Sequence, residues 1–502
     1  MHTDHDIDVL GAHSTVPQGA VTGKLIEQHG IDTIPESERH SSPKTIFMIL
    51  IGAELTYGVI VTGWLPIALG LGWWSSVTAL ILGLVIGSAV LAPMALLGPR
   101  SGTNGAVSSG AFFGVVGRII GSALSIFIAI GFYALTVWTG GQAAVAGLHR
   151  AFGTPDSNLY LGISYAVMAI FTVAIAIIGH DYMARANKFM IPTSGLILVI
   201  AIFVFGPQFD ASYVGGSYAL GSFWATWGLV VTIGASMPIS YAPFVNDWSR
   251  YVSRATSRDR AIALATGVGS FIGLGFALLF GAYISVTFAD PTVPFITGLI
   301  DTSPTWFLVP LVLVGLFGTF GQGGLALYGT GLDFSSLIPS LRRVAATVVL
   351  STIGVAFIFM GTLVWNIVDS VSAFLLILTV FTTPWLIVCV IGLAWRRGYL
   401  NASDMQVFNR GERGGVYWYT SGLNFRAIVA WAAGGIVGFL FLNTTVYIGP
   451  WANAFGGIDA SFASAAIVSA VVYVALLLIS PESRDGYSAT ASTSAAAPPP
   501  RV

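Results

Sequence analysis

A single carboxylate lies inside the first strongly apolar stretch of the chain, the run 46–70. In a helix with a rise of 1.5 Å per residue, Glu54 would sit about 12 Å from the polar end of that run. An ionisable side chain at such a depth in a membrane is costly and marks a functional site by default. Burial disfavours the charged form, so Glu54 could carry a proton; alternatively, it could be a structural carboxyl bonded to open backbone of the sixth run.

An aromatic and an amide side chain follow each other at helical spacing in the third apolar run. Trp138 and Gln142 are four residues apart, so they share one helix face. A flat heteroaromatic molecule could stack on the indole, a contact worth on the order of 1 kcal/mol beyond burial, and hydrogen-bond to the amide. Trp138 lies too deep in the run for an ordinary interface anchor. We therefore predict that both residues bind substrate.

Four further residues complete the predicted substrate site. Tyr241 lies between two prolines of the sixth run and could form a second aromatic wall or belong to the core. Gln322 is flanked by glycines in GTFGQGGLALYG of the eighth run, where small residues let helices approach closely. It could bind substrate or make an interhelical hydrogen bond. Gly58 and Thr62 lie in the first run, where the helix is expected to open.

Two apolar runs contain helix-breaking residues. The first reads TYGVIVTGWLP, with Gly58, Gly63 and Pro66, and the sixth reads ASMPISYAPF, with Pro238 and Pro243. Proline removes a backbone donor and clashes with the preceding turn, so we expect both helices to open there. In lipid, open backbone is tolerated only where it lines a cavity enclosed by protein. Interruptions at corresponding places in two halves of a chain point to a transporter site.

The sixth run ends in the sequence NDWSRY, residues 246–251. Asp247 and Arg250 could pair with each other or with a neighbouring loop at this solvated helix end. We assign these two residues, with Pro238 and Pro243, a gating or structural role.

The composition indicates what must position these residues. Of 502 residues, 55% are hydrophobic and only 9% are charged, whereas a soluble protein carries about 25% charged residues. Lipid is therefore the expected solvent. A net charge of -1 gives no basic field for nucleic acid, and the single cysteine, Cys389, excludes an intrachain disulfide.

About twelve runs are long and apolar enough to span a membrane as helices. They lie near residues 46–70, 76–97, 119–148, 159–179, 189–206, 223–245, 262–288, 305–331, 344–364, 367–395, 427–447 and 463–480. With twelve spans and an inner N-terminus, every Lys and Arg except Arg150 falls on the cytoplasmic side, as the positive-inside rule requires. We expect a multi-pass protein of the plasma (inner) membrane with both termini in the cytoplasm.

The chain divides into four predicted parts. Residues 1–44 are a polar cytoplasmic tail without the apolar core of a signal peptide. Residues 45–398 form a ten-helix transport core, whose five-helix halves, about 45–206 and 223–398, are inverted because each holds an odd number of spans. Residues 399–480 contain a loop and two accessory helices. Residues 481–502, rich in Ser, Ala and Pro, are a disordered tail.

Five stretches resemble the nucleobase:cation symporter-1 family, and within it the purine–cytosine permeases. They are TGWLPIALGLG, LLGPRSGTNGAVSSGAFFG, the Trp138–Gln142 pair, SYAPFVNDWSRY and ALYGTGLDF. The resemblance covers roughly residues 45–400 and implies a LeuT-type fold, a 5+5 inverted repeat plus two extra helices, working by alternating access. It also implies that the aromatic residue at Trp138 stacks on the base, while Gln142 and the sixth and eighth helices hydrogen-bond its edge.

The chain departs from this resemblance in two places. Sodium-coupled members carry hydroxyl ligands on the eighth helix, where this chain has Gly321, Gln322, Gly323 and Gly324, so Glu54 offers a bound proton instead. The sixth helix has Pro238 where some members place a second stacking aromatic, so that role passes to Tyr241 or lapses.

The sequence thus predicts a symporter that imports cytosine, a purine, allantoin or a related heterocycle, with a proton or possibly Na+ as the coupling ion and no other cofactor or metal. An amino-acid or amine transporter on the same fold, or a sodium-coupled permease, is the alternative. The sequence contains neither an H-E-x-x-H nor a G-x-S-x-G motif, so it gives no indication of an enzyme. The expected partners are a small heterocyclic substrate and the lipid bilayer, with no nucleic acid, and the chain is expected to be a monomer or a loose oligomer.

Overall fold

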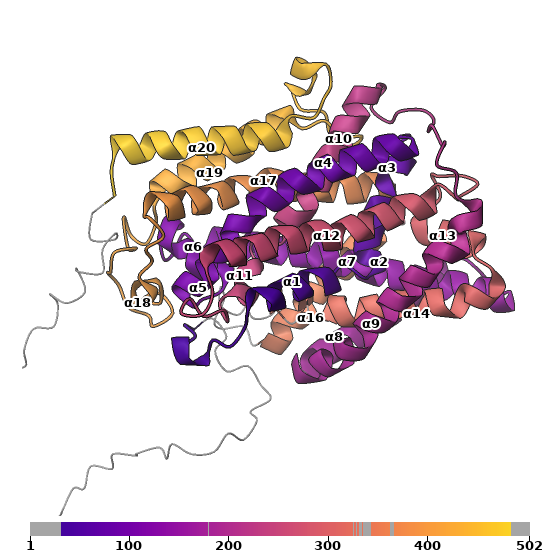
Figure 1. Cartoon of the computed structure of the whole chain (residues 1–502), viewed down its shortest axis with the longest axis horizontal. Helices are drawn as coiled ribbons and strands as arrows, with labels where there is room; N and C mark the ends of the chain where they lie inside the picture. Colours follow the sequence, from indigo (N-terminus) through magenta and orange to yellow (C-terminus); the bar gives the residue numbers. More distant parts are fainter. Residues whose placement is uncertain are drawn as a thin grey trace, which may run out of the picture.

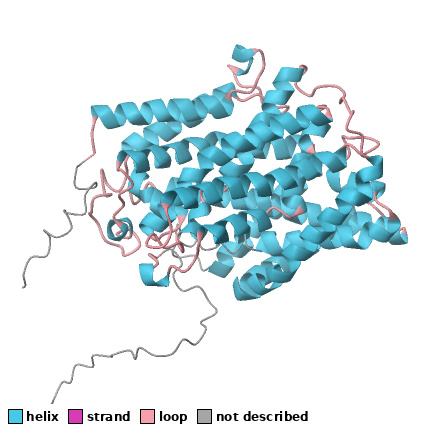
Figure 2. Cartoon of the chain, in the orientation of Figure 1, coloured by secondary structure: helices cyan, strands magenta, loops and turns pink. Residues whose placement is uncertain are grey.

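The computed structural model describes residues 32–178, 180–324, 326, 327, 329, 330, 334, 343–361 and 366–482. Every regular element in this part of the chain is helical, as Figure 2 shows. The predicted all-α class is therefore confirmed. Of the tails predicted for residues 1–44 and 481–502, residues 1–31 and 483–502 lie outside the described residues.

The first span is a bent pair of helices. α1 (Pro43–Gly52) begins at a capping box made by Ser42 and Thr45. After a break, α2 (Tyr57–Ile60) and α3 (Leu65–Ala68) continue through a 3-10 turn, and the two parts of the span meet at 76°. Residues on both sides of this bend are buried among other helices, which is where irregular backbone is tolerated in a membrane.

Longer helices form the rest of the bundle. They are α4 (Trp73–Leu91), α7 (Ile119–Phe152), α8 (Asn158–Ile178), α9 (His180–Phe205), α10 (Phe223–Ser240), α12 (Asp259–Ser285), α14 (Leu308–Gly318) with the π-helical turn η6 (Thr319–Gly323), α16 (Arg343–Phe359), α17 (Ile367–Trp395), α19 (Phe425–Phe441) and α20 (Ser461–Ile479).

The spans agree closely with the predicted runs. In the described part of the chain, nine helices are long and apolar enough to cross a membrane, and the bent pair can add a tenth. Two shorter apolar helices, Ala345–Phe359 and Phe425–Phe441, coincide with two further predicted runs. The total of twelve spans stays a prediction.

Glycines set the closest helix crossings. α4 lies along α10, and a Cβ added at Gly83 or Gly87 would come within 2.3 or 2.4 Å of a carbonyl oxygen of α10. On the other side of the bundle, a Cβ at Gly63 would lie 2.0 Å from the Leu278 carbonyl oxygen of α12. Larger residues at these positions would force the helices apart.

Short helices connect the spans. They are α5 (Leu97–Ser101), α6 (Gly105–Phe113), α11 (Val245–Ser249), α13 (Phe295–Thr302) and α18 (Ala402–Met405). Figure 1 places α3 and α13 toward one end of the bundle and α5, α6 and α18 toward the other. The accessory helices α19 and α20 pack on each other and against α17.

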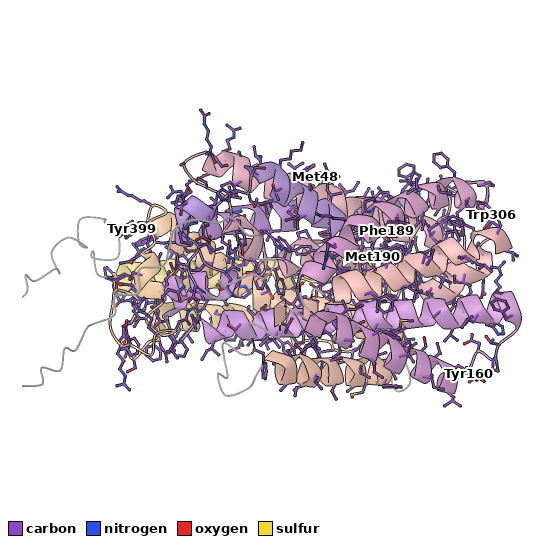
Figure 3. All side chains as sticks on the ribbon, turned by 90° about the horizontal axis from the view of Figure 1, so that it is seen from below. Met48, Tyr160, Phe189, Met190, Trp306 and Tyr399 are labelled. Carbon is purple, nitrogen blue, oxygen red and sulfur yellow. The ribbon has the colours of Figure 1, made fainter. Side chains whose placement is uncertain are left out.

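The outer surface of the bundle is apolar. Figure 3 labels Met48, Phe189 and Trp306, and these residues are 56%, 66% and 67% exposed. Large exposed hydrophobic side chains recur along α8, α9 and α20. A surface of this kind is suited to contact with lipid, because in water such exposed apolar side chains would promote aggregation.

The end that carries α5, α6 and α18 is rich in arginine, and we call it the arginine-rich end. Arg396, 2% exposed, bonds to the carboxylate of Glu482 at 2.8 Å and to the Ala111 carbonyl oxygen at 2.6 Å. Arg39 donates to the Pro99 carbonyl oxygen at 2.8 Å, and Glu36 accepts from the Ser253 hydroxyl at 2.6 Å. These contacts join segments far apart in sequence.

Candidate substrate and ion site

The break in the first span lies at residues 53–56, upstream of the predicted opening. The expectation that Gly58, Gly63 and Pro66 mark the opening is wrong for a physical reason. Pro66 occupies the first turn of α3, where a missing N–H costs no hydrogen bond. Gly58 and Gly63 remain in helical turns and serve close packing.

Glu54 lies in this break and is fully buried. Its Cγ would be 2.9 Å from a Cβ added at Gly273, so the side chain packs directly on α12. Neither carboxylate oxygen accepts a hydrogen bond from a described residue. The Tyr241 hydroxyl faces the carboxyl without meeting the geometry of a hydrogen bond. Within the described structure, Glu54 therefore does not hold the open backbone of the sixth span.

The sixth span loses regular α-helix where the sequence predicts an opening, but it stays one span without a sharp bend. α10 continues through Pro238 to Ser240, the chain turns at residues 241–244, and α11 follows. Pro243 lies in the turn, and Tyr241 packs its ring 5.8 Å from that of Trp248. The open segment therefore presents Tyr241 toward Glu54.

Of the predicted gating residues, Asp247 lies in α11 and Arg250 directly follows it. Arg250 is 5% exposed, and its guanidinium lies over the ring of Tyr251 at 5.3 Å. Asp247 lies in the first turn of the same helix. A neighbouring side chain, Asn246, accepts the Gly98 N–H at 3.0 Å, so α11 is tied to α5.

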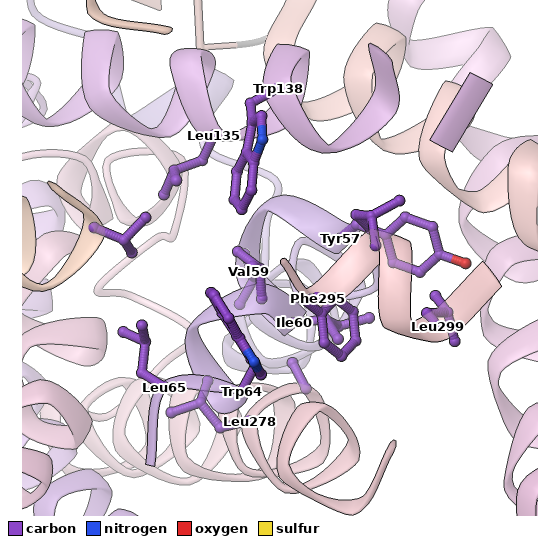
Figure 4. Close-up of a cluster of buried hydrophobic side chains, with 14 of the residues drawn as sticks. Tyr57, Val59, Ile60, Trp64, Leu65, Leu135, Trp138, Leu278, Phe295 and Leu299 are labelled. Atoms are coloured by element: carbon purple, nitrogen blue, oxygen red, sulfur yellow. The ribbon is translucent and has the colours of Figure 1, made fainter. Parts of the chain in front are cut away.

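Trp138 and Gln142 lie on one face of α7, as predicted. The indole is 3% exposed, and Figure 4 shows it pointing toward the α2 segment that carries Val59 and Ile60. Gln142 is 8% exposed; its Nε2 donates to the Thr297 hydroxyl at 3.0 Å, while its Oε1 is buried with no hydrogen-bond partner among the described residues. A buried acceptor left unpaired costs about 1–3 kcal/mol, so the position suits a ligand N–H.

Gln322 lies in the π-helical turn η6, and π-helical turns are frequent at functional sites. Its Oε1 accepts a hydrogen bond from Thr56, the last residue of the break in the first span. The same turn is held to α7 by Thr319, whose hydroxyl donates to the Thr136 carbonyl oxygen at 2.7 Å. The π-helical turn thus joins the broken span to the helix that carries Trp138.

The remaining predicted substrate residues occupy packing positions. A Cβ at Gly58 would lie 2.7 Å from Thr136 Cγ2, so Gly58 lets α2 approach α7. The Thr62 hydroxyl is fully buried and donates to the Val59 carbonyl oxygen of its own helix at 2.6 Å. Their predicted contact with substrate stays a prediction.

Polar residues that the sequence analysis did not single out hold the site together. Thr56, Thr297 and Thr319 each bond to a residue on another element. Thr56 could have been found from the sequence, because it places a hydroxyl two residues after Glu54 inside an apolar run. The contact between Gln142 and Thr297 spans 155 residues and leaves no periodic mark in the sequence.

The end of the bundle opposite the arginine-rich end is covered by α13. Phe295 packs edge-on against Tyr57 at 6.4 Å, and the Trp64 indole donates to the Pro291 carbonyl oxygen at 2.8 Å. Arg150 bonds to the Ile300 carbonyl oxygen. This short helix was not predicted, because eight residues are too few for a periodic signal to stand out from the adjacent spans.

Comparisons with known proteins agree with this geometry. Residues 33–463 match the family described as permeases for cytosine/purines, uracil, thiamine and allantoin. The chain is 27% identical over 475 residues to YxlA of Bacillus subtilis (strain 168), named as a candidate purine-cytosine permease, covering 92% of this chain and 98% of that one. It is 23% identical over 464 residues to the purine-uracil permease NCS1 of Arabidopsis thaliana, covering 83% and 74%.

Solved structures share the fold. The inward facing conformation of Mhp1 matches with a TM-score of 0.71 and 17% identity, covering 92% of this chain and 97% of that one. MHP1, a nucleobase-cation-symport-1 family transporter, in a closed conformation with bromovinylhydantoin bound, matches with a TM-score of 0.68 and 16% identity, covering 93% and 99%. A Na+-coupled sialic acid symporter in an outward-open state matches less well, with a TM-score of 0.53 and 11% identity over 88% and 91%. These likenesses confirm the predicted fold class.

Proposed function

Because the chain belongs to the family of permeases for cytosine/purines, uracil, thiamine and allantoin, we propose that it imports a nucleobase or related heterocycle by symport. A family of permeases places it among multi-pass membrane transporters and not among enzymes. The observation that carries the proposal is the position of Trp138 and the unpaired Gln142 carbonyl on one buried face of α7, opposite the broken first span.

The substrate is a flat ring with an amide-like edge. Its face would stack on Trp138, and a ring N–H would donate to Gln142 Oε1. The Gln322 carbonyl already accepts from Thr56, so its amide nitrogen can donate to a ring carbonyl. Neighbouring C=O and N–H groups occur in cytosine, uracil, oxidised purines and allantoin, so this pattern selects a chemical class and not one compound.

The coupling ion is a proton carried by Glu54. A carboxylate that is fully buried without a hydrogen bond is very unfavourable as an anion, so the carrier would cross the occluded state in its neutral form. The Tyr241 hydroxyl, which faces Glu54, is placed to stabilise the anion when the proton leaves.

The arginine-rich end faces the cytoplasm under this proposal, by the positive-inside rule. The protein then lies in the plasma membrane with both termini in the cytoplasm. In this orientation α13 covers the outer entrance. The protein works as a monomer or a loose oligomer.

Uptake of labelled cytosine into proteoliposomes tests the proposal. We expect accumulation under an imposed inward pH gradient, competition by unlabelled purines, uracil and allantoin, and no competition by amino acids. Uptake driven by a sodium gradient alone would support the proposed transport of cytosine but contradict the proton as the coupling ion. Competition by amino acids in place of bases would reject the substrate class.

The variant Trp138→Ala tests the site itself. Truncating this indole removes the stacking surface, so we expect binding of cytosine to fall at least tenfold, on the scale of aromatic stacking plus lost burial. Trp224→Ala is the control, because Trp224 is 62% exposed on α10 and lies outside the site. Normal cytosine binding by a correctly inserted Trp138→Ala protein would remove Trp138 from the site.

A further inference from the structure

The Gln142 amide connects the substrate site with the helix that covers the outer end of the bundle. One side of this amide, Nε2, donates to Thr297 on α13 at 3.0 Å. The other side, Oε1, is buried and accepts no hydrogen bond from a described residue. The same planar group therefore reaches the covering helix with one atom and the site with the other.

The covering helix α13 has few polar contacts with the transport core. Besides the bond to Gln142, Phe295 packs against Tyr57, the Pro291 carbonyl just before the helix accepts from Trp64, and the Ile300 carbonyl accepts from Arg150 at the end of α7. Figure 4 shows Phe295 and Leu299 near Tyr57 and away from Trp138. The hydrogen bond between Gln142 and Thr297 is thus the contact that connects the substrate site with α13.

We propose that Thr297 is a positioning residue that links occupancy of the substrate site to closure of α13 over it. This inference rests on the proposed function. The amide of Gln142 is planar, so the bond to Thr297 fixes the direction of Oε1. A substrate N–H that donates to Oε1 polarises the amide and strengthens the bond from Nε2 to Thr297.

Linkage makes this effect reciprocal. If closure of α13 improves substrate binding, substrate binding must favour closure by the same factor. When α13 moves away, Gln142 loses its orienting partner and the site loses a fixed acceptor. An occupied site would therefore close more readily than an empty one.

Two variants at Thr297 and one control variant at Thr302 test this contact. Thr297→Val keeps the shape but removes the acceptor, so we expect cytosine to bind about fivefold to tenfold more weakly, the effect of one lost hydrogen bond. Thr297→Ser keeps the hydroxyl and should bind cytosine within about twofold of the parent protein. Thr302→Val, on the same helix but without a hydrogen bond to Gln142, is the matched control. Binding is measured with labelled cytosine on the full chain in lipid nanodiscs.

A second readout follows α13 itself. Leu299 is fully buried against the first span, and Cys389 is the single cysteine, so Leu299→Cys in a Cys389→Ala background gives one reporter thiol. We expect cytosine to slow its reaction with a membrane-impermeant maleimide several-fold. Thr297→Val should abolish this protection even at saturating cytosine, and Thr297→Ser should preserve it.

Two results would overturn the inference. One is Thr297→Val binding cytosine like the parent; the other is full protection of the reporter thiol in the Thr297→Val protein at saturating cytosine. Both leave the proposed function intact, since the parent protein still binds the base. Failure of the parent protein to bind any of cytosine, uracil, purines and allantoin would instead refute the proposed function.

Discussion

Replacing Glu54 by glutamine is the most informative single change. Glutamine keeps the size and shape of the side chain but cannot release a proton. The carboxyl it replaces is fully buried, packs on Gly273 and accepts no hydrogen bond from a described residue. Structural consequences should therefore be small, and the effect should fall on coupling.

The size of the effect follows from the number of carboxyls. Among the described residues, the side-chain carboxylates of Glu54, Asp459 and Glu482 are buried. Asp459 is held outside the spans by Ser461 and the Asn443 N–H, and Glu482 is paired with Arg396, so Glu54 is the one inside a span. One carrier implies one proton per substrate. Each pH unit is worth about 1.4 kcal/mol, so a two-unit gradient supports up to about 100-fold accumulation. Glu54→Gln should reduce this ratio to about 1 while leaving exchange of substrate across the membrane possible.

The assay compares two modes of transport in the same proteoliposomes. Gradient-driven accumulation of labelled cytosine should be lost in Glu54→Gln, while exchange of labelled for unlabelled cytosine at equal pH should persist. The control is Glu412→Gln, an exposed carboxyl at the arginine-rich end. Accumulation well above 1 by Glu54→Gln under the pH gradient would refute the assignment of Glu54 as the carrier.

Two further predictions concern the arginine-rich end. Arg396→Ala leaves the buried Glu482 carboxylate without its charge partner, so we expect a loss of about 3–5 kcal/mol, measured as unfolding of the detergent-solubilised protein, whereas the exposed Arg413→Ala should change little. The Ser253 hydroxyl, followed by the Arg39 charge, holds the pKa of Glu36 below its usual 4.5. The attachment of residues 33–42 is therefore complete above that value and should weaken as the pH falls through the lowered pKa, seen as faster hydrogen exchange there; exchange in Glu36→Gln should not respond to this acidification.

Hydropathy and spacing were enough to predict most of the architecture. Long apolar runs locate spans because lipid requires a continuous apolar helix, and α7 and α17 begin and end within a few residues of the predicted limits. The shared face of Trp138 and Gln142 followed from their four-residue spacing. The turns at residues 241–244 lie between Pro238 and Pro243, where the backbone chemistry of proline predicts an irregularity, although α10 itself runs through Pro238.

Long-range contacts explain what the sequence could not predict. The break in the first span is placed at Glu54 by packing against α12 and not by the nearby glycines and Pro66. Arg396 was expected in a solvated loop, yet it is buried because Glu482, 86 residues later, supplies its counter-charge. Such pairings depend on how distant segments meet, and a single sequence carries no periodic trace of them.

The pairing of Arg396 with Glu482 also determines when the arginine-rich end can form during synthesis of the protein. The chain grows at about 5–20 residues per second, so the 86 residues that separate the two partners take about 4 to 17 s to translate. During that interval the guanidinium at the end of α17 has no carboxylate to neutralise it. The helices before it can insert, but the arginine-rich end can close only after Glu482 has been translated. A chain released before that point would keep a cation at the end of α17 without the carboxylate that neutralises it.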